Sequence, residues 1–224
     1  MIEVEGVTHT YGDFTALRDV SVALDERRVG LIGANGSGKS TFARLLNGLV
    51  VPSRGRVRVD GLDTARDGRK VRRRVGFCFT DPDAQIVMPT VAEDVAFSLR
   101  RSGLPRAEID AKVAKTLATF GLTDYADHPA HQLSGGQKQL LALSSVLVLD
   151  PALLVCDEPT TLLDLRNTRQ VVEILHDLPQ HVVLVTHDLA TLTGFDRVLV
   201  FDGGRIVCDA PPAEAVARYE EMMQ

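Results

Sequence analysis

The residues with the clearest chemistry form one glycine-rich run, Gly33-Ala34-Asn35-Gly36-Ser37-Gly38-Lys39-Ser40, which follows the apolar residues Val29 to Ile32. Glycines at this spacing let successive backbone N–H groups point into one concavity, and the N-terminus of the helix expected from Lys39 completes an anion seat. Lys39 adds positive charge for the β- and γ-phosphates, and Ser40 offers a hydroxyl ligand to Mg²⁺. The run therefore predicts a nucleotide phosphate-binding loop that continues into Thr41.

Two acidic residues, Asp157 and Glu158, follow the continuous apolar run Ala152 to Cys156. Such a run is typical of a strand buried on both faces of a parallel sheet. The C-terminal ends of these strands are where open α/β sheets place their ligands. We therefore expect Asp157 to hold Mg²⁺ and Glu158 to orient or deprotonate a water molecule.

Three further polar groups stand at the ends or starts of expected elements. His187 follows the apolar run Val182 to Val185, where it can donate a hydrogen bond to a γ-phosphate. The other histidines, His9 among them, are expected to be ordinary surface or helix-end residues. Ser134-Gly135-Gly136-Gln137 precedes a helical pattern, and it fits either a second anion site or a plain helix cap. Tyr11 fits either an adenine-stacking aromatic or a turn residue.

The elements that position these groups alternate between strand and helix patterns. Half-buried antiparallel strands are expected at Ile2 to Val7 and within Leu17 to Leu24, and further strands at Arg56 to Val59 and Val75 to Phe79. Residues 91 to 120 have a helical pattern broken at Gly103-Leu104-Pro105, so they resemble a helical insertion. The tail predicts strands at Arg197 to Phe201 and Arg205 to Cys208, followed by a helix after Pro212.

Composition limits the function classes. The chain of 224 residues has a net charge of −5, which argues against a general nucleic-acid binder. The basic run Arg66 to Arg74 is interpreted as a solvated helix face. Cys78, Cys156 and Cys208 lack CxxC spacing, so neither a disulfide framework nor a zinc site is expected. No secretion signal is recognised and no stretch supplies the roughly 20 apolar residues of a membrane span, so we expect a cytoplasmic protein.

Taken together, the phosphate loop, Leu133-Ser134-Gly135-Gly136-Gln137, the strand ending in Asp157-Glu158 and the strand ending before His187 resemble the ATPase subunits of ABC transporters. The resemblance covers the whole chain and implies one α/β domain of the P-loop NTPase type. It implies a mixed sheet core with an antiparallel β subdomain, over residues 1–80 and 150–224. Residues 81–149 would form a mostly helical signature subdomain.

The same resemblance implies that two subunits pack head to tail around ATP and Mg²⁺. Residues Ser134, Gly135, Gly136 and Gln137 of one subunit would then close over the γ-phosphate bound at Lys39 of the other, because a facing helix dipole stabilises charge that one loop contacts from one side only. Tyr11 would stack on adenine, Asp164 would be the interface-loop aspartate, and His187 would contact the γ-phosphate.

Two positions depart from the usual pattern of the family. Thr80 stands where a glutamine usually contacts Mg²⁺ and water, and its shorter side chain makes direct contact with the metal doubtful. The interface loop has Thr161-Leu162-Leu163-Asp164 in place of Ser-Ala-Leu-Asp. Because Glu158 and His187 are retained, we expect a working ATPase.

Within the family, the segment from Asp81 to Gln85 and the following residues Pro89 to Phe97 resemble the ATPases of energy-coupling-factor (ECF) importers, with the biotin-type ATPase as the favoured match. That resemblance implies a homodimer, an integral membrane coupling subunit contacted by Gln85, and a separate substrate-binding membrane subunit. The ATPase would sit on the inner face of the cell membrane. The alternatives are a soluble ABC ATPase of the cluster-assembly or DNA-repair type and a small-molecule kinase, which would leave the LSGGQ stretch without a purpose.

Overall fold

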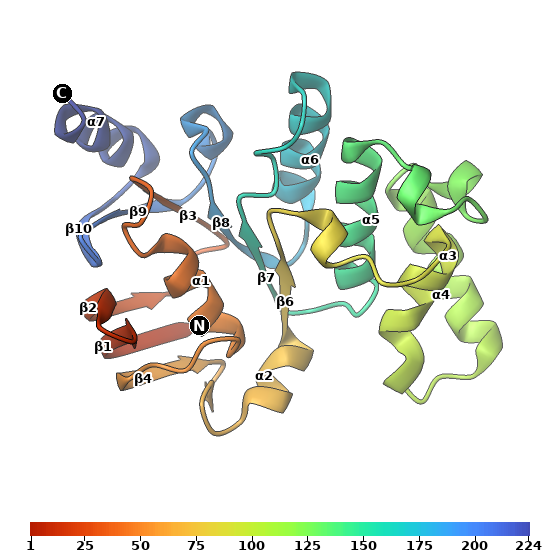
Figure 1. Cartoon of the computed structure of the whole chain (residues 1–224), viewed down its shortest axis with the longest axis horizontal. Helices are drawn as coiled ribbons and strands as arrows, with labels where there is room; N and C mark the ends of the chain where they lie inside the picture. The colour runs from red at the N-terminus through yellow and green to blue at the C-terminus, as the bar shows by residue number, and fades with distance from the viewer.

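A six-stranded sheet forms the centre of the computed structural model, which describes all of residues 1–224 (Figure 1). The strand order is β10-β9-β3-β8-β7-β6, and every pair is parallel except β10 with β9. Every residue of β3 and β7 is buried, as expected for central strands that are covered on both faces. The strands are β3 (Arg28–Gly33), β6 (Val75–Cys78), β7 (Leu153–Asp157), β8 (His181–Val185), β9 (Arg197–Asp202) and β10 (Arg205–Ala210).

A second, antiparallel sheet has the order β2-β1-β4-β5. Along β1 the residues Ile2 and Val4 alternate inward as expected, and a bulge at Gly6, whose φ angle is 55°, shifts the phase so that Val7 and His9 are buried too. The expectation that His9 lies at the surface is wrong, because its place on this inward face leaves the side chain only 8% exposed. The strands are β1 (Ile2–Tyr11), β2 (Phe14–Leu24), β4 (Arg54–Val59) and β5 (Leu62–Asp63).

Helix α1 (Lys39–Asn47) lies between the two sheets and buries Phe42, Leu45 and Leu46 against both of them. The opposite face of the six-stranded sheet is covered by helices that include α5, α6 and α7 (Figure 1). Successive residues of β7 contribute to the two cores in turn: Leu154 and Cys156 belong to the helical side, and Leu153 and Val155 belong to the side of α1. The six-stranded sheet therefore lies between α1, with the antiparallel sheet beyond it, and the helices of the opposite face.

Between β6 and β7 the chain is almost entirely helical, and this part forms the right-hand lobe of Figure 1. The long helices here agree with the predicted helical insertion. Short 3₁₀ turns lie in the connections between them. The elements are η1 (Pro82–Ala84), α3 (Val91–Ser98), η2 (Leu99–Arg101), α4 (Arg106–Thr119), η3 (Thr123–Tyr125), η4 (Ala130–Gln132) and α5 (Gly135–Leu147).

Besides α1, four helical elements lie outside this lobe. No helix is expected from the sequence between β7 and β8, yet α6 occupies most of that segment. Its start is marked by Asp164, whose side chain accepts a hydrogen bond from the N–H of Asn167. No helix of the chain has the length and apolar character that crossing a membrane requires. The four elements are α2 (Gly68–Arg74), α6 (Leu165–Asp177), η5 (Leu189–Leu192) and α7 (Pro212–Met222).

Candidate nucleotide-binding site

The glycine-rich run forms the loop between β3 and α1. Gly33, Gly36 and Gly38 all have positive φ angles, of 144°, 77° and 105°. A Cβ on Gly33 would lie 2.1 Å from the carbonyl oxygen of Phe201, and one on Gly38 would lie 2.6 Å from that of Ala16, so both positions require glycine. Gly36 has nothing within 4 Å of its Cβ position, which leaves open space above the loop.

Lys39 is the first residue of α1 and only 4% of its side chain is exposed. Its ammonium group donates to the carbonyl oxygens of Gly33 at 2.7 Å and Ala34 at 2.9 Å, which uses two of its three donors. Burial lowers the pKa of Lys39, and the charges of Glu158 and Asp157 act in the opposite direction. The start of α1 has no side-chain cap, so its free N–H groups and the Lys39 charge form an anion seat.

Asp157 ends β7 directly beside the loop. Its Oδ1 accepts a hydrogen bond from the Ser40 hydroxyl at 2.8 Å, and its Oδ2 lies 3.4 Å from the guanidinium of Arg44. The residue is 2% exposed, and this burial raises the pKa of its carboxyl group, although Ser40 and Arg44 offset part of the effect. A buried carboxylate next to a hydroxyl offers the hard oxygen donors that Mg²⁺ prefers. The residues present therefore fit the metal.

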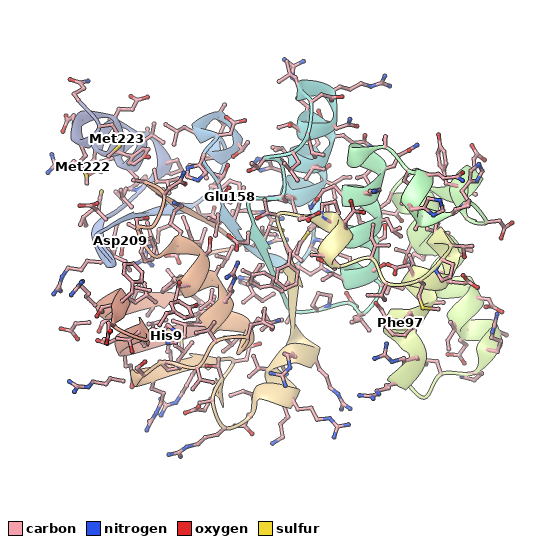
Figure 2. The ribbon with its side chains drawn as sticks, viewed as in Figure 1. His9, Phe97, Glu158, Asp209, Met222 and Met223 are labelled. Atoms are coloured by element: carbon pink, nitrogen blue, oxygen red, sulfur yellow. The ribbon has the colours of Figure 1, made fainter.

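Glu158 lies at the centre of the molecule, between the loop and the helical lobe (Figure 2). Its Oε1 lies 2.7 Å from Nε2 of His187, and its Oε2 accepts a hydrogen bond from the Thr161 hydroxyl at 3.1 Å. Its φ angle of 54° is in the left-handed region, which is uncommon for a residue with a side chain and is typical of positions held by their surroundings at functional sites. Both carboxylate oxygens are thus fixed in direction.

A hollow of about 240 Å³ lies over the loop. Tyr11 and Phe14, which face each other across the β1–β2 turn, form one wall of it, and Glu158 belongs to another. Both aromatic side chains are exposed, which suits stacking on a flat base. A larger cavity of about 850 Å³ lies between the C-terminal ends of α4, α5 and α6, but no predicted site residue lines it, so the chemistry identifies the smaller hollow as the candidate site.

The segment Ser134 to Gln137 lies apart from this hollow and contributes no residue to its lining. Ser134 and Gln137 form a capping box at the start of α5, with Gln137 Oε1 accepting from the Ser134 N–H at 2.9 Å. A Cβ on Gly136 would lie 2.3 Å from the side chain of Asn167, so this glycine permits α5 and α6 to meet. Asp164, which caps α6 three residues before Asn167, therefore lies near the start of α5.

Thr80 and Gln85 follow β6. The Thr80 hydroxyl donates to the backbone carbonyl of Asp157 at 2.6 Å, so its proton is directed to the backbone of Asp157 rather than to the side-chain carboxylate. Gln85 accepts from the Phe79 N–H at 3.2 Å and donates to the Ala142 carbonyl at 3.0 Å. Its carboxamide therefore connects the end of β6 to helix α5.

Three residues of the site were not identified in the sequence analysis. Arg44 is one turn along α1 from Ser40, and an i, i+4 spacing was the available signal. Phe14 follows Tyr11 by three residues across a Gly-containing turn, so hairpin pairing was the signal. No local signal indicated that Thr161 holds Glu158, because that contact depends on the left-handed backbone at Glu158.

Comparison with known proteins agrees with this geometry. The sequence model of the family described as ABC transporter matches residues 17–161, which is more than half of the chain. The chain belongs to the ABC transporter family. It is an ATP-binding subunit and an ATPase of that family, and the fold expected for such a subunit is confirmed.

Several relatives of this ABC ATPase match over almost its whole length. A putative ABC transporter ATP-binding protein of Deinococcus radiodurans is 55% identical over 100% of this chain and 99% of the relative. The biotin transport ATP-binding protein BioM of Rhizobium etli is 49% identical over 99% of this chain and 98% of the relative. The energy-coupling factor transporter ATP-binding protein EcfA1 of Symbiobacterium thermophilum is 41% identical over 99% of this chain and 83% of the relative. The predicted resemblance to ECF-type ATPases is confirmed.

Solved structures give the same result. CbiO1 of Clostridium perfringens, described as part of the ABC transporter complex CbiONQ, has a TM-score of 0.86 at 33% identity, with 99% of this chain and 92% of that chain covered. The ATP-binding cassette MJ0796, solved as a dimer in a post-hydrolysis state with ADP and phosphate, has a TM-score of 0.83 at 28% identity, with 95% and 99% covered. The kinase alternative is excluded by family membership, and the soluble, non-transport alternative is not favoured.

Proposed function

We propose that this chain is the ATP-hydrolysing motor subunit of an ECF importer, working as a head-to-tail homodimer attached to a transmembrane coupling subunit. One observation carries the proposal: the hollow over the loop contains Lys39, Ser40 and Glu158 but no residue of the Ser134 to Gln137 segment. That segment is intact on another part of the surface. A second copy turned head to tail would bring it over the hollow, and the dimer of MJ0796 supports this arrangement.

In such a site each side chain has a defined task. The backbone N–H groups of the loop and the Lys39 ammonium would bind the β- and γ-phosphates of ATP, while Tyr11 would stack on the adenine. Mg²⁺ bound by Ser40 and Asp157, with Thr80 near by, would supply positive charge to the phosphate oxygens. Glu158 would accept a proton from the attacking water, because His187 and Thr161 already orient its two oxygens. His187 would donate to a γ-phosphate oxygen.

The coupling step is assigned to Gln85. Its two hydrogen bonds join the strand that ends beside Thr80 to helix α5, which Ser134 caps, so they connect the two half-sites that one chain would contribute to the dimer. A membrane subunit that moved this residue would therefore change the distance between the halves. We infer that the chain divides accordingly, with a core and β subdomain at 1–80 and 150–224 and a helical subdomain at 81–149.

The transported solute is assigned to biotin on the basis of the similarity to BioM, and a separate membrane subunit would bind it. The ATPase would then be cytoplasmic and peripheral on the inner face of the membrane. Capture of the tagged chain from membranes in mild detergent should recover an integral membrane coupling subunit. If no such subunit is recovered, the transport role is contradicted. If the chain hydrolyses ATP but recovers no subunit, it remains an ATPase without the proposed transport partner.

The coupling assignment has its own experiment. Gln85→Ala should retain hydrolysis but lose most ATP-driven uptake of labelled biotin in reconstituted transporter, because the bridge between Phe79 and Ala142 is gone. Gln170→Ala, at an exposed glutamine of α6, is the matched control and should behave as wild type. Normal uptake by Gln85→Ala would remove Gln85 from the coupling path.

A further inference from the structure

A group of arginines lies on and beside the short helix α2, at the opposite edge of the core sheet from the nucleotide site. Helix α2 leads directly into the N-terminal end of β6, whereas Thr80 and Asp157 lie beyond or at the C-terminal ends of β6 and β7. Figure 2 shows many nitrogen-tipped side chains around β4 and α2, along the lower edge of the molecule. The group is thus separate from the residues that bind and hydrolyse ATP.

The charge of this region is opposite to that of the rest of the chain. Residues 54–74 contain nine Arg or Lys and three Asp, which gives a charge of +6. Because the whole chain carries −5, the remaining residues carry −11. Four of the nine basic residues have a carboxylate partner, and these are Arg56, Arg58, Lys70 and Arg74. The other five have no carboxylate within ion-pair distance.

Four of these unpaired residues form what we call the arginine patch: Arg66, Arg69, Arg72 and Arg73, all of them exposed. Val71 is the buried residue that fixes α2 on the core. At about 100° per residue, Arg69 and Arg73 project roughly 160° away from Val71 and thus directly outward. Arg69 and Arg73 therefore present two guanidinium groups without ion-pair partners on the outward face of α2.

Exposed aliphatic side chains adjoin the patch. The guanidinium of Arg72 donates to the carbonyl oxygen of Gly48 at 3.3 Å, which places it against the end of α1. The next residue, Leu49, and Val51 are both exposed, at 46% and 51%. Basic and apolar groups therefore occur side by side, a combination that suits the interface between headgroups and acyl chains.

We propose that the arginine patch binds the anionic headgroups of a membrane, an inference that rests on the proposed attachment of the chain to a membrane partner. A guanidinium group can donate two parallel hydrogen bonds to the oxygens of one phosphate. Clusters of four or more basic residues beside a membrane bind anionic lipids. Helix α2 has seven residues and is about 10 Å long, which suits a few headgroups. A nucleic-acid site with roughly six to ten phosphate contacts would need a longer basic surface.

Vesicle sedimentation with the full-length chain tests the proposal. Vesicles of phosphatidylcholine with about 30% phosphatidylglycerol, an anionic lipid, should bind the chain at low salt, and pure phosphatidylcholine vesicles should not. Arg69→Glu/Arg73→Glu should reduce this binding at least tenfold and leave hydrolysis unchanged. Lys112→Glu/Lys115→Glu on α4 is the matched control, because it makes the same charge change at exposed, unpaired lysines. It should bind like wild type.

Each other outcome overturns the inference. Failure of the wild-type chain to bind the anionic vesicles would do so, since a protein of net charge −5 needs a local basic surface for this contact. Equal losses in the two variants would show a general charge effect. Tighter binding to a short duplex RNA or DNA than to the vesicles, at the same salt, would assign the patch to nucleic acid. If the membrane subunit is recovered but the chain does not bind the vesicles, the lipid-binding proposal is refuted and the proposed transport function is unaffected.

Discussion

Two helix starts of this ABC ATPase look alike in sequence, since each has glycines next to a serine, but the structure builds them differently. The start of α1 has a left-handed glycine, Gly38, and no side-chain cap, so its N–H groups are free for a ligand. The start of α5 is closed by the capping box of Ser134 and Gln137. The first is a permanent anion seat. The second has its backbone N–H groups hydrogen-bonded by its own side chains. It would therefore bind a phosphate only when that phosphate is already held by the loop of a partner copy.

This difference fits the proposed order of events. ATP would bind first at α1 of one copy, where Lys39 keeps one donor free and the helix start has no side-chain cap. The start of α5 from the second copy would then add its dipole, with Ser134 able to exchange its internal hydrogen bond for one to the γ-phosphate. The dimer is therefore expected to depend on ATP.

The largest expected effect comes from Glu158→Gln. This variant should keep the start of α1 in one copy and the start of α5 in the other on the same unhydrolysed ATP. Hydrolysis should fall about a thousandfold, because the amide cannot accept the proton of water. ATP binding should be retained, and a dimer should accumulate in ATP and Mg²⁺ on size-exclusion chromatography. Hydrolysis near the wild-type rate would show that another residue is the base.

The next-largest effects are expected from single substitutions at each of the two helix starts, measured by nucleotide titration and by phosphate release. Lys39→Ala should weaken ATP binding about a hundredfold, because charge-assisted hydrogen bonds are lost. Ser134→Arg should leave binding by the monomer intact but block dimer formation and hydrolysis.

Mixing these two variants, at an ATP concentration too low to saturate Lys39→Ala, gives the sharpest test of the head-to-tail arrangement. A mixed dimer has one site with an intact loop and an intact signature segment, so activity should return to about a quarter of the wild-type rate when half of the dimers are mixed. Each variant alone is the control. No recovery on mixing would mean that loop and signature segment act within one chain.

The capping box itself makes a smaller, measurable contribution. Ser134→Ala should lower the free energy of unfolding by about 1 kcal/mol, or roughly 2–4 °C in Tm, and should also reduce hydrolysis. Thr90→Ala is the matched control, because Thr90 and Glu93 form a second capping box at the start of α3. It should lose similar stability without loss of hydrolysis. A fall in stability alone for Ser134→Ala would limit Ser134 to capping.

The smallest change is expected at Thr80. The hydroxyl donates to the backbone of Asp157 and leaves the side-chain carboxylate of that residue to Ser40 and Arg44. Thr80→Gln should therefore leave basal hydrolysis similar to wild type or somewhat higher, within about threefold, since a longer amide only adds a possible water or metal contact. Steady-state phosphate release measures it, and a loss of tenfold or more would show that the Thr80 contact is required.

Local patterns were sufficient for much of the fold. The apolar runs that became β3, β7 and β8 are fully or almost fully buried, because strands between two helical layers must be apolar on both faces. Helix α6 was missed, although Asp164 with Asn167 three residues later is a cap signal. His9 was misplaced because histidine is usually read as polar, and because the register shift between Val4 and Val7 changes the phase of β1 and turns His9 inward.

The sequence alone determined the parts of the site: the phosphate loop, the Asp157-Glu158 pair, His187 and the LSGGQ stretch, each of them a short motif whose chemistry is local. Only the tertiary structure decided how these parts meet. The contact of Glu158 with His187 requires β7 and β8 to be neighbours in the sheet. The separation of Ser134 from the loop depends on how the helical lobe packs. Both follow from long-range packing, which no local residue pattern records.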